Sequence, residues 1–160
     1  MKKIVSLLVL LVAFASCEED IKFNNPAVQA EKNNEKWKAT SFSAKKTGNS
    51  VIITASNDVE TVTLTINAPA PNSVHNLGLD DVNTAAYELK VDNIQETYRT
   101  GTDLGNGKIV IMGERDNNIN GTDGKGFISG TFYFNAYNEE DEAVNFQEGV
   151  FYKVPFVIEP

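Results

Sequence analysis

Residues 59–68 show the cleanest alternation of apolar and polar side chains in the sequence, and this pattern limits the fold more than any other part of the chain. Val62, Leu64 and Ile66 fall on one face of an extended chain, and threonines occupy the positions between them. Branched aliphatic side chains on one face and threonines on the other are typical of an antiparallel strand with one buried face. We therefore predict a half-buried strand here, ended by the Pro-rich turn at 69–73.

Similar short segments recur along the chain between clusters of Gly, Pro, Asn, Asp and Ser. Two alternating runs around the polar turn 32–35 predict a hairpin, with a short helix over 27–36 as the alternative. Further strands are expected at 50–55, 86–91, 94–98, 108–114, 127–137 and 148–158, and a loop or one helical turn at 77–82. Since no convincing long helix is present, we predict an all-β fold, an antiparallel β-sandwich or open barrel of about eight to ten short strands.

The aromatic side chains suggest both a core and a binding surface. In the segment 127–137, one face is expected in the core: Ile128, Gly130, Phe132, Phe134 and Ala136. Trp37, which lies near small residues on an early strand, is expected to anchor the same core. An exposed aromatic face could instead pack on a sugar ring. The candidate ligand-binding residues, together with neighbouring acids, are Tyr98, Tyr133 and Tyr137.

The first sixteen residues have the composition of a signal peptide. Lys2 and Lys3 precede an apolar run at 4–13, and small residues lead to the single cysteine of the chain, Cys17. The run is shorter than the about 20 residues that a membrane-spanning helix needs. Residues 14–17 resemble a bacterial lipobox, with Phe14 where leucine is commonest. The resemblance implies cleavage before Cys17 and attachment of acyl chains such as palmitate, which anchor stably when two or three are present. A secreted protein with an incidental cysteine is the alternative.

Three acidic residues, Glu18, Glu19 and Asp20, follow the cysteine directly. They resemble the signal by which Bacteroidota export lipoproteins to the cell surface. Anionic membranes attract Lys and Arg instead, so a signal read by a receptor explains the acids better than adhesion does; a solvated linker is the alternative. We expect residues 17–25 to tether a single β-domain over 26–160 to the outer membrane, facing the cell exterior.

Two segments of the expected domain carry a further resemblance. Residues 127–134 read Phe-Ile-Ser-Gly-Thr-Phe-Tyr-Phe, and residues 148–151 read Glu-Gly-Val-Phe. Together with Trp-Lys-Ala at 37–39 and Tyr-Glu-Leu at 87–89, they resemble a family of small Bacteroidota lipoproteins whose domain has no assigned function. The resemblance spans residues 24–154 and implies an extracytoplasmic β-domain without assigned catalytic residues.

Charge and residue types exclude several classes of function. The net charge of −8 at pH 7 excludes nucleic-acid binding by phosphate neutralisation. The one histidine, His75, is expected in an exposed loop near Ser73, and no glycine elbow surrounds any serine. One histidine and one acylated cysteine cannot form a tetrahedral zinc site, and the glycines at 121–126 lack the spacing of a phosphate-binding loop. We expect neither enzymatic activity nor a cofactor other than the covalent lipid.

One segment resembles the start of a calcium-binding loop. Residues 116–121 read Asp-Asn-Asn-Ile-Asn-Gly, so that oxygen atoms at alternate positions could converge on an ion. Phe127 occupies the position of the bidentate glutamate, and the flanks resemble strands, which favours a hairpin tip rich in residues that accept left-handed backbone. The calcium ligands to be tested are Asp116, Asn118, Asn120 and Asp123.

The sequence thus predicts a lipid-anchored, non-enzymatic binding or accessory module for a glycan or protein partner. The alternative is a structural or envelope-assembly lipoprotein without a small-molecule ligand. The first function predicts a concave aromatic patch with nearby acids. The second predicts a flat polar surface and an exposed strand edge that can pair with a partner.

Overall fold

The computed structural model describes residues 27–121 and 124–157. Within these ranges, most segments that alternate between apolar and polar side chains form strands. The described elements are β1 (Val28–Lys32), β2 (Glu35–Lys38), β3 (Ser41–Thr47), β4 (Ser50–Ser56), β5 (Glu60–Asn67), β6 (Val74–Leu77), β7 (Thr84–Val91), β8 (Ile94–Arg99), β9 (Asn106–Ile111), the 3-10 helix η1 (Glu114–Asp116), β10 (Phe127–Tyr137) and β11 (Ala143–Pro155). The predicted all-β fold is confirmed. The described part of the chain contains no helix that could cross a bilayer.

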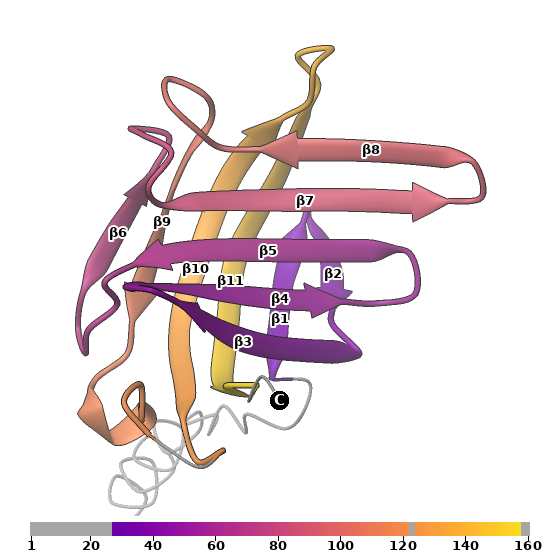
Figure 1. The fold of residues 1–160 in the computed structure, drawn as a ribbon. Coiled ribbons are helices and arrows are strands. Elements are labelled where there is room, and N and C mark those ends of the chain that lie inside the picture. Colours follow the sequence, from indigo (N-terminus) through magenta and orange to yellow (C-terminus); the bar gives the residue numbers. More distant parts are fainter. Residues whose placement is uncertain (1–26, 122–123, 158–160) are drawn as a thin grey trace, which may run out of the picture.

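The strands form one antiparallel sheet that curls into a half-barrel. Its hydrogen-bonded path runs β2-β1-β11-β10-β8-β7-β5-β4-β3, while β9 and then β6 extend from β10. In Figure 1, strands β3, β4, β5, β7 and β8 run across the molecule, and β1, β10 and β11 cross behind them at a steep angle. The two parts meet through the ladder pair Tyr137–Arg99 on one side and through the bridge Ala44–Phe156 on the other.

Aromatic side chains fill the space between the two parts of the sheet. Trp37 is 3% exposed, as predicted for a core anchor, and its ring meets that of Phe146 edge-on at 5.8 Å between centroids. Phe146 also stacks on Phe134 at 4.7 Å and contacts Tyr87 of β7 at 5.4 Å. Phe146 therefore joins β2, β10 and β7 in a single core.

Two glycine–phenylalanine pairs lie opposite each other in the long β10–β11 hairpin. Gly130 pairs with Phe151, and Phe132 pairs with Gly149. A Cβ atom on Gly149 would lie 2.6 Å from the ring of Phe132, and a Cβ atom on Gly130 would overlap the ring of Phe151. Each glycine thus leaves room for the ring on the opposite strand. This packing explains why the Ser-Gly-Thr-Phe and Glu-Gly-Val-Phe segments occur together.

The predicted hairpin near the start of the domain is confirmed, and the helix alternative was wrong. Asn33 and Asn34 connect β1 to β2 with φ angles of 49° and 66°, the left-handed pair that a tight two-residue hairpin turn requires. β11 begins at Ala143, five positions before its predicted start at 148. The backbone at Glu148 has a φ of 50° and forms a bulge, which interrupts the alternation from which the start was predicted.

Candidate functional site

β8 and β10 share one ladder pair, Tyr137–Arg99, and β10 ends at that pair, so the edge of β8 before Arg99 has no neighbouring strand among the described residues. We call the opening beside this edge the seam; its walls are the outer edge of β8 at 95–97 and the β10–β11 turn at 138–142. One pocket of 490 Å³ is lined by Gln95, Glu96, Thr97, Asn138, Glu139, Glu140 and Glu142. A second, of 380 Å³, is lined by Thr97, Arg99, Leu104, Tyr137, Asn138, Glu139 and Asp141. The two pockets share three lining residues and therefore adjoin each other.

The backbone of Gln95 and Thr97 points into the seam. The N–H of Thr100 donates to the carbonyl of Ala85 at 2.9 Å, which sets the alternation along this strand pair. In an antiparallel ladder only every second residue bonds to the neighbouring strand, so the even-numbered residues of β8 bond to β7. The odd-numbered residues face the other way, and of these Arg99 pairs with β10. Within the described chain, no strand pairs with Gln95 or Thr97 on this side.

Asn138 fixes the shape of the opposite wall. Its Oδ1 accepts the backbone N–H groups of Glu140 and Glu142 at 3.0 and 2.8 Å, and its Nδ2 donates to the Glu142 carboxylate at 3.0 Å. Asp141 completes the turn with a φ of 61°. The turn therefore presents the side chains of Glu139, Glu140 and Asp141 to solvent.

Tyr98 connects the two walls from inside the sheet. Its hydroxyl donates to Glu96 at 3.0 Å and lies 3.5 Å from an oxygen of Glu142. Burial and these carboxylates raise the pKa of Tyr98 to about 12. Tyr98 is only 9% exposed, so the prediction that it belongs to an exposed aromatic cluster does not hold. Even-numbered side chains of β8 face the interior, and the sequence pattern of this short strand did not reveal which face is buried.

The other two candidate tyrosines lie on the outward face of β10. Tyr133 is 40% exposed, and Tyr137 is half-buried and lines the seam. They are four positions apart, a distance of about 13 Å along a strand. The structure therefore brings Tyr98 and Tyr137 to the two sides of the seam, but it does not join the three tyrosines into one concave surface.

The seam carries a concentration of negative charge. Its five carboxylates belong to Glu96, Glu139, Glu140, Asp141 and Glu142. None of them forms an ion pair within the part of the chain that the structure describes. Arg99 also lines the seam, but the carboxylates outnumber it, and a cleft of net negative charge attracts ligands of the opposite sign. In the described ranges, no group of three or more His, Cys, Asp or Glu side chains is arranged to hold a metal ion.

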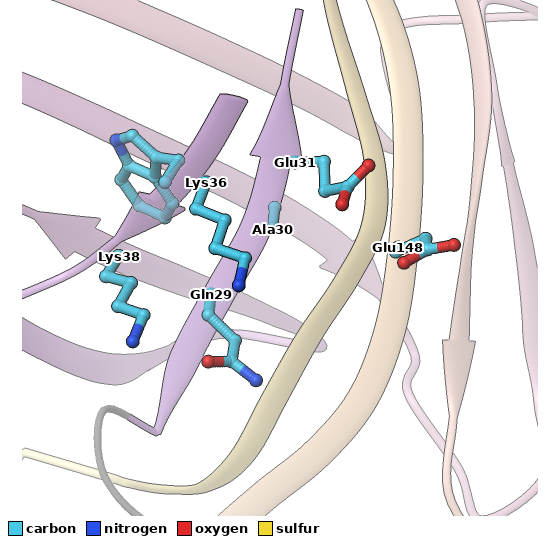
Figure 2. Close-up of a pocket in the computed structure, with 7 residues that line it drawn as sticks. Gln29, Ala30, Glu31, Lys36, Lys38 and Glu148 are labelled. Atoms are coloured by element: carbon cyan, nitrogen blue, oxygen red, sulfur yellow. The ribbon is translucent and has the colours of Figure 1, made fainter. Parts of the chain in front are cut away.

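A smaller hollow of 230 Å³ lies on the outer face of β1 and β2, and Figure 2 shows its side chains. Charges of both signs line it, because Lys36 stands opposite Glu31 in the strand pair and Lys38 stands opposite Gln29. Lysines on an edge strand discourage further strand pairing. Trp37 also lines the hollow, and its Nε1 has no hydrogen-bond partner among the described residues. The balanced charge and the small size make this a weaker candidate than the seam.

A partly buried polar cluster joins the two parts of the sheet. Lys32 of β1 forms an ion pair with Glu60 of β5, and the hydroxyl of Tyr87 donates to Glu60 at 2.8 Å. Burial acts to lower the pKa of Lys32, but the hydrogen bonds with Glu60 and Tyr87 raise it overall. Burial acts to raise the pKa of Glu60, but hydrogen bonds from Lys32, Asn57 and Tyr87 lower it overall. Both shifts favour the charged pair, which fits a role in holding β1 against β5 and β7.

His75 was predicted in an exposed loop, and this prediction was wrong. It lies on β6, which pairs with β9, and is 9% exposed. Its Nε2 lies 2.8 Å from the hydroxyl oxygen of Ser73, which also accepts the N–H of Ala70 at 3.1 Å. Burial lowers the pKa of His75, although a hydrogen bond with Asn83 opposes the shift. The contact with Ser73 ties the imidazole of β6 to the turn that precedes the strand. Four alternating residues are too short a pattern to predict β6.

Two of the proposed calcium ligands form hydrogen bonds within the protein instead. Asp116 accepts the Tyr152 hydroxyl at 3.4 Å, and the side-chain amide of Asn118 donates to the Lys125 carbonyl at 2.9 Å. Asn120 is exposed, and Asp123 lies outside the described residues. Neighbouring Asn117, which the sequence did not single out, donates to the Met112 carbonyl at 2.7 Å and accepts the Ser129 N–H at 2.7 Å. These contacts favour a structural loop; calcium binding stays a prediction.

The predicted anchor residues Cys17, Glu18, Glu19 and Asp20 lie outside the described residues. Comparison with protein families matches residues 24–155 to a domain of unknown function, DUF6252. No curated protein and no solved structure matches the chain.

Proposed function

Since the chain belongs to the DUF6252 family, whose description assigns no activity, we propose its function from the leader and the seam. We infer that it is a lipid-anchored, non-enzymatic binding module of the outer membrane, facing the cell exterior. Its partner is a protein that binds at the seam. Cys17 carries the acyl chains, and Glu18, Glu19 and Asp20 form the export signal.

The observation that carries this proposal is the separation between the chain ends and the seam. The carbonyl of Ala27, the first described residue, accepts the N–H of Tyr152 at 2.7 Å. Val157, the last described residue, donates to Ala44 at 2.9 Å. Both ends thus lie near the end of β11, while the 138–142 turn lies at its beginning, about 30 Å away along the strand. Figure 1 shows that turn and the end of β11 at opposite ends of the molecule. In a domain anchored through Cys17, the seam would therefore lie at the end opposite the point where the tether joins the described chain.

A protein partner fits the seam better than a glycan does. A sugar-binding platform needs exposed aromatic faces close together, but Tyr98 is buried and Tyr133 lies apart from Tyr137. The seam instead offers unpaired strand backbone and carboxylates, which are groups that another polypeptide can bond to.

The unpaired edge of β8 also favours a second candidate function, that of an envelope-assembly component. In that case the partner is a permanent neighbour in the outer membrane. Deleting the protein should then sensitise cells to detergents and large antibiotics. A binding module with an exchangeable partner predicts no such envelope defect.

The anchoring part of the proposal is tested by the Cys17→Ala variant. We expect the variant to lose labelling by a fatty-acid analogue and to leave the membrane fraction. The wild-type chain is the control. Because Cys17 is its only cysteine, any acyl group attached through sulfur must be on that residue. Continued acyl labelling of the variant would exclude Cys17 as the attachment site, and a soluble, unlabelled wild type would exclude the anchor.

A further inference from the structure

We propose that the seam binds an extended, lysine- or arginine-rich segment of a protein, which pairs with the free edge of β8 as an additional strand. This inference rests on the proposed function and specifies the chemistry of the partner.

The backbone at the edge of β8 supplies the pairing groups. The N–H and C=O groups of Gln95 and Thr97 point away from β7, and both residues are exposed and line the larger pocket. Unpaired strand edges of this kind accept an extended peptide through main-chain hydrogen bonds. The bridge between Arg99 and Tyr137 closes one end of the opening, so the added strand would begin there and continue toward the β7–β8 turn.

The other edges of the described sheet are less accessible to a partner strand. β2 carries Lys36 and Lys38, and lysines on an edge oppose pairing. Beside β3, Val157 already donates to the carbonyl of Ala44 at 2.9 Å. β6 has a free edge of similar length, four residues, but it lines neither pocket of the seam. The β8 edge, by contrast, presents the uncharged side chains of Gln95 and Thr97.

The charge of the opposite wall selects the partner. Glu139, Glu140 and Asp141 are exposed on the turn and have no ion-pair partner among the described residues. A strand added to β8 would place alternate side chains near these carboxylates, where lysine or arginine is favoured. A second copy of the chain would bring two such acidic walls together, and an anionic polymer or membrane would meet the same repulsion.

The test is calorimetric titration of the mature acylated chain, which begins at Cys17, in detergent micelles with a synthetic peptide of about eight residues that alternates lysine and valine. We expect binding that weakens strongly when the ionic strength is raised to about 1 M, where the Debye length is about 3 Å. A glutamate–valine peptide is the charge control and should not bind. In a second control peptide, proline replaces every valine, so every second residue lacks a backbone N–H group. This peptide should bind at least about tenfold more weakly than the lysine–valine peptide, because strand addition depends on main-chain hydrogen bonds.

Two sets of protein variants separate the strand edge from the charge. Thr97→Pro removes an N–H group that only a partner would use, and it should abolish binding while the circular dichroism spectrum stays that of the wild type. The triple variant Glu139→Gln, Glu140→Gln, Asp141→Asn should bind about tenfold more weakly. Its matched control removes three exposed carboxylates elsewhere: Glu35→Gln, Asp58→Asn, Glu114→Gln.

The results that would overturn the inference are equally specific. They are equal binding of the lysine and glutamate peptides, full binding by the triple variant, or a salt-sensitive dimer of the chain that forms without peptide. A folded Thr97→Pro variant that binds normally would also overturn strand pairing. In each case the lipid anchor and its Cys17→Ala test stand unaffected, so failure of this inference is distinguishable from failure of the proposed function.

Discussion

At two positions of the β10–β11 hairpin, Gly130 and Gly149, an aromatic ring occupies the space that a larger side chain would need. Changing Gly149 to alanine would push a methyl group against the ring of Phe132, which lies 2.6 Å from the Cβ position. Overpacking of a filled core typically costs about 1–3 kcal/mol. We therefore expect Gly149→Ala to lower the free energy of unfolding by about that amount in urea denaturation.

The control for this prediction is Gly113→Ala. The nearest atom to its Cβ position is Asn72 Oδ1 at 3.5 Å, an ordinary contact distance. The control should therefore change stability by less than about 0.5 kcal/mol. Equal effects of the two substitutions would show that the glycine–phenylalanine packing does not determine stability.

Also at the residue scale, the ion pair between Lys32 and Glu60 makes the free energy of unfolding depend on pH. The pKa of Glu60 is lowered from its ordinary value of 4.5. Its contribution to stability is therefore complete above pH 4.5 and is lost as the pH falls through the lowered pKa. We expect Glu60→Gln to be less stable than wild type at neutral pH, with a difference that shrinks below pH 4.5.

Thermal or urea unfolding of both proteins across this pH range measures the effect. Glu35→Gln is the control, because Glu35 is exposed on β2 and exposed charges contribute little. A difference between Glu60→Gln and wild type that stays constant down to strongly acidic pH would contradict this account of the cluster.

At the scale of elements, the β1–β2 hairpin depends on the left-handed backbone of its turn. Asn34 has a φ of 66°, a conformation that costs most L residues roughly 1–2 kcal/mol. We expect Asn34→Val to destabilise the domain by about that amount, whereas Asn34→Gly should keep or slightly raise stability. Urea denaturation of both variants checks this. A tolerated valine would mean that the turn does not control the hairpin.

Strand prediction succeeded where a repeated local pattern was long enough to read. The alternation of Val62, Leu64 and Ile66 predicts β5, and all three side chains are at most 1% exposed. β6 was missed because four residues carry too little pattern, and the start of β11 was missed because the bulge at Glu148 breaks the alternation. Local patterns report which face of a strand is buried, but a bulge or a short strand removes that information.

At the scale of the whole molecule, the seam depends on pairings between distant segments. β1 pairs with β11, and β8 meets β10 at one residue pair. Nothing in the sequence around Gln95 and Thr97 indicates which neighbour this edge has or lacks. The candidate tyrosines and acids could be chosen by residue type. Which of these side chains lie inside the sheet and which line the seam could not be predicted, because that depends on how the whole sheet curls.

In the proposed function, the anchored domain presents the seam to the cell exterior. The most direct measurement is the labelling of a Thr97→Cys variant by a membrane-impermeant maleimide in intact cells. Cys17, the only native cysteine, would be blocked by its lipid. We expect the new thiol to be labelled on intact cells, and more strongly than the thiol of a Val157→Cys control, which lies beyond the end of β11. Labelling of Thr97→Cys only after the outer membrane has been broken would contradict it.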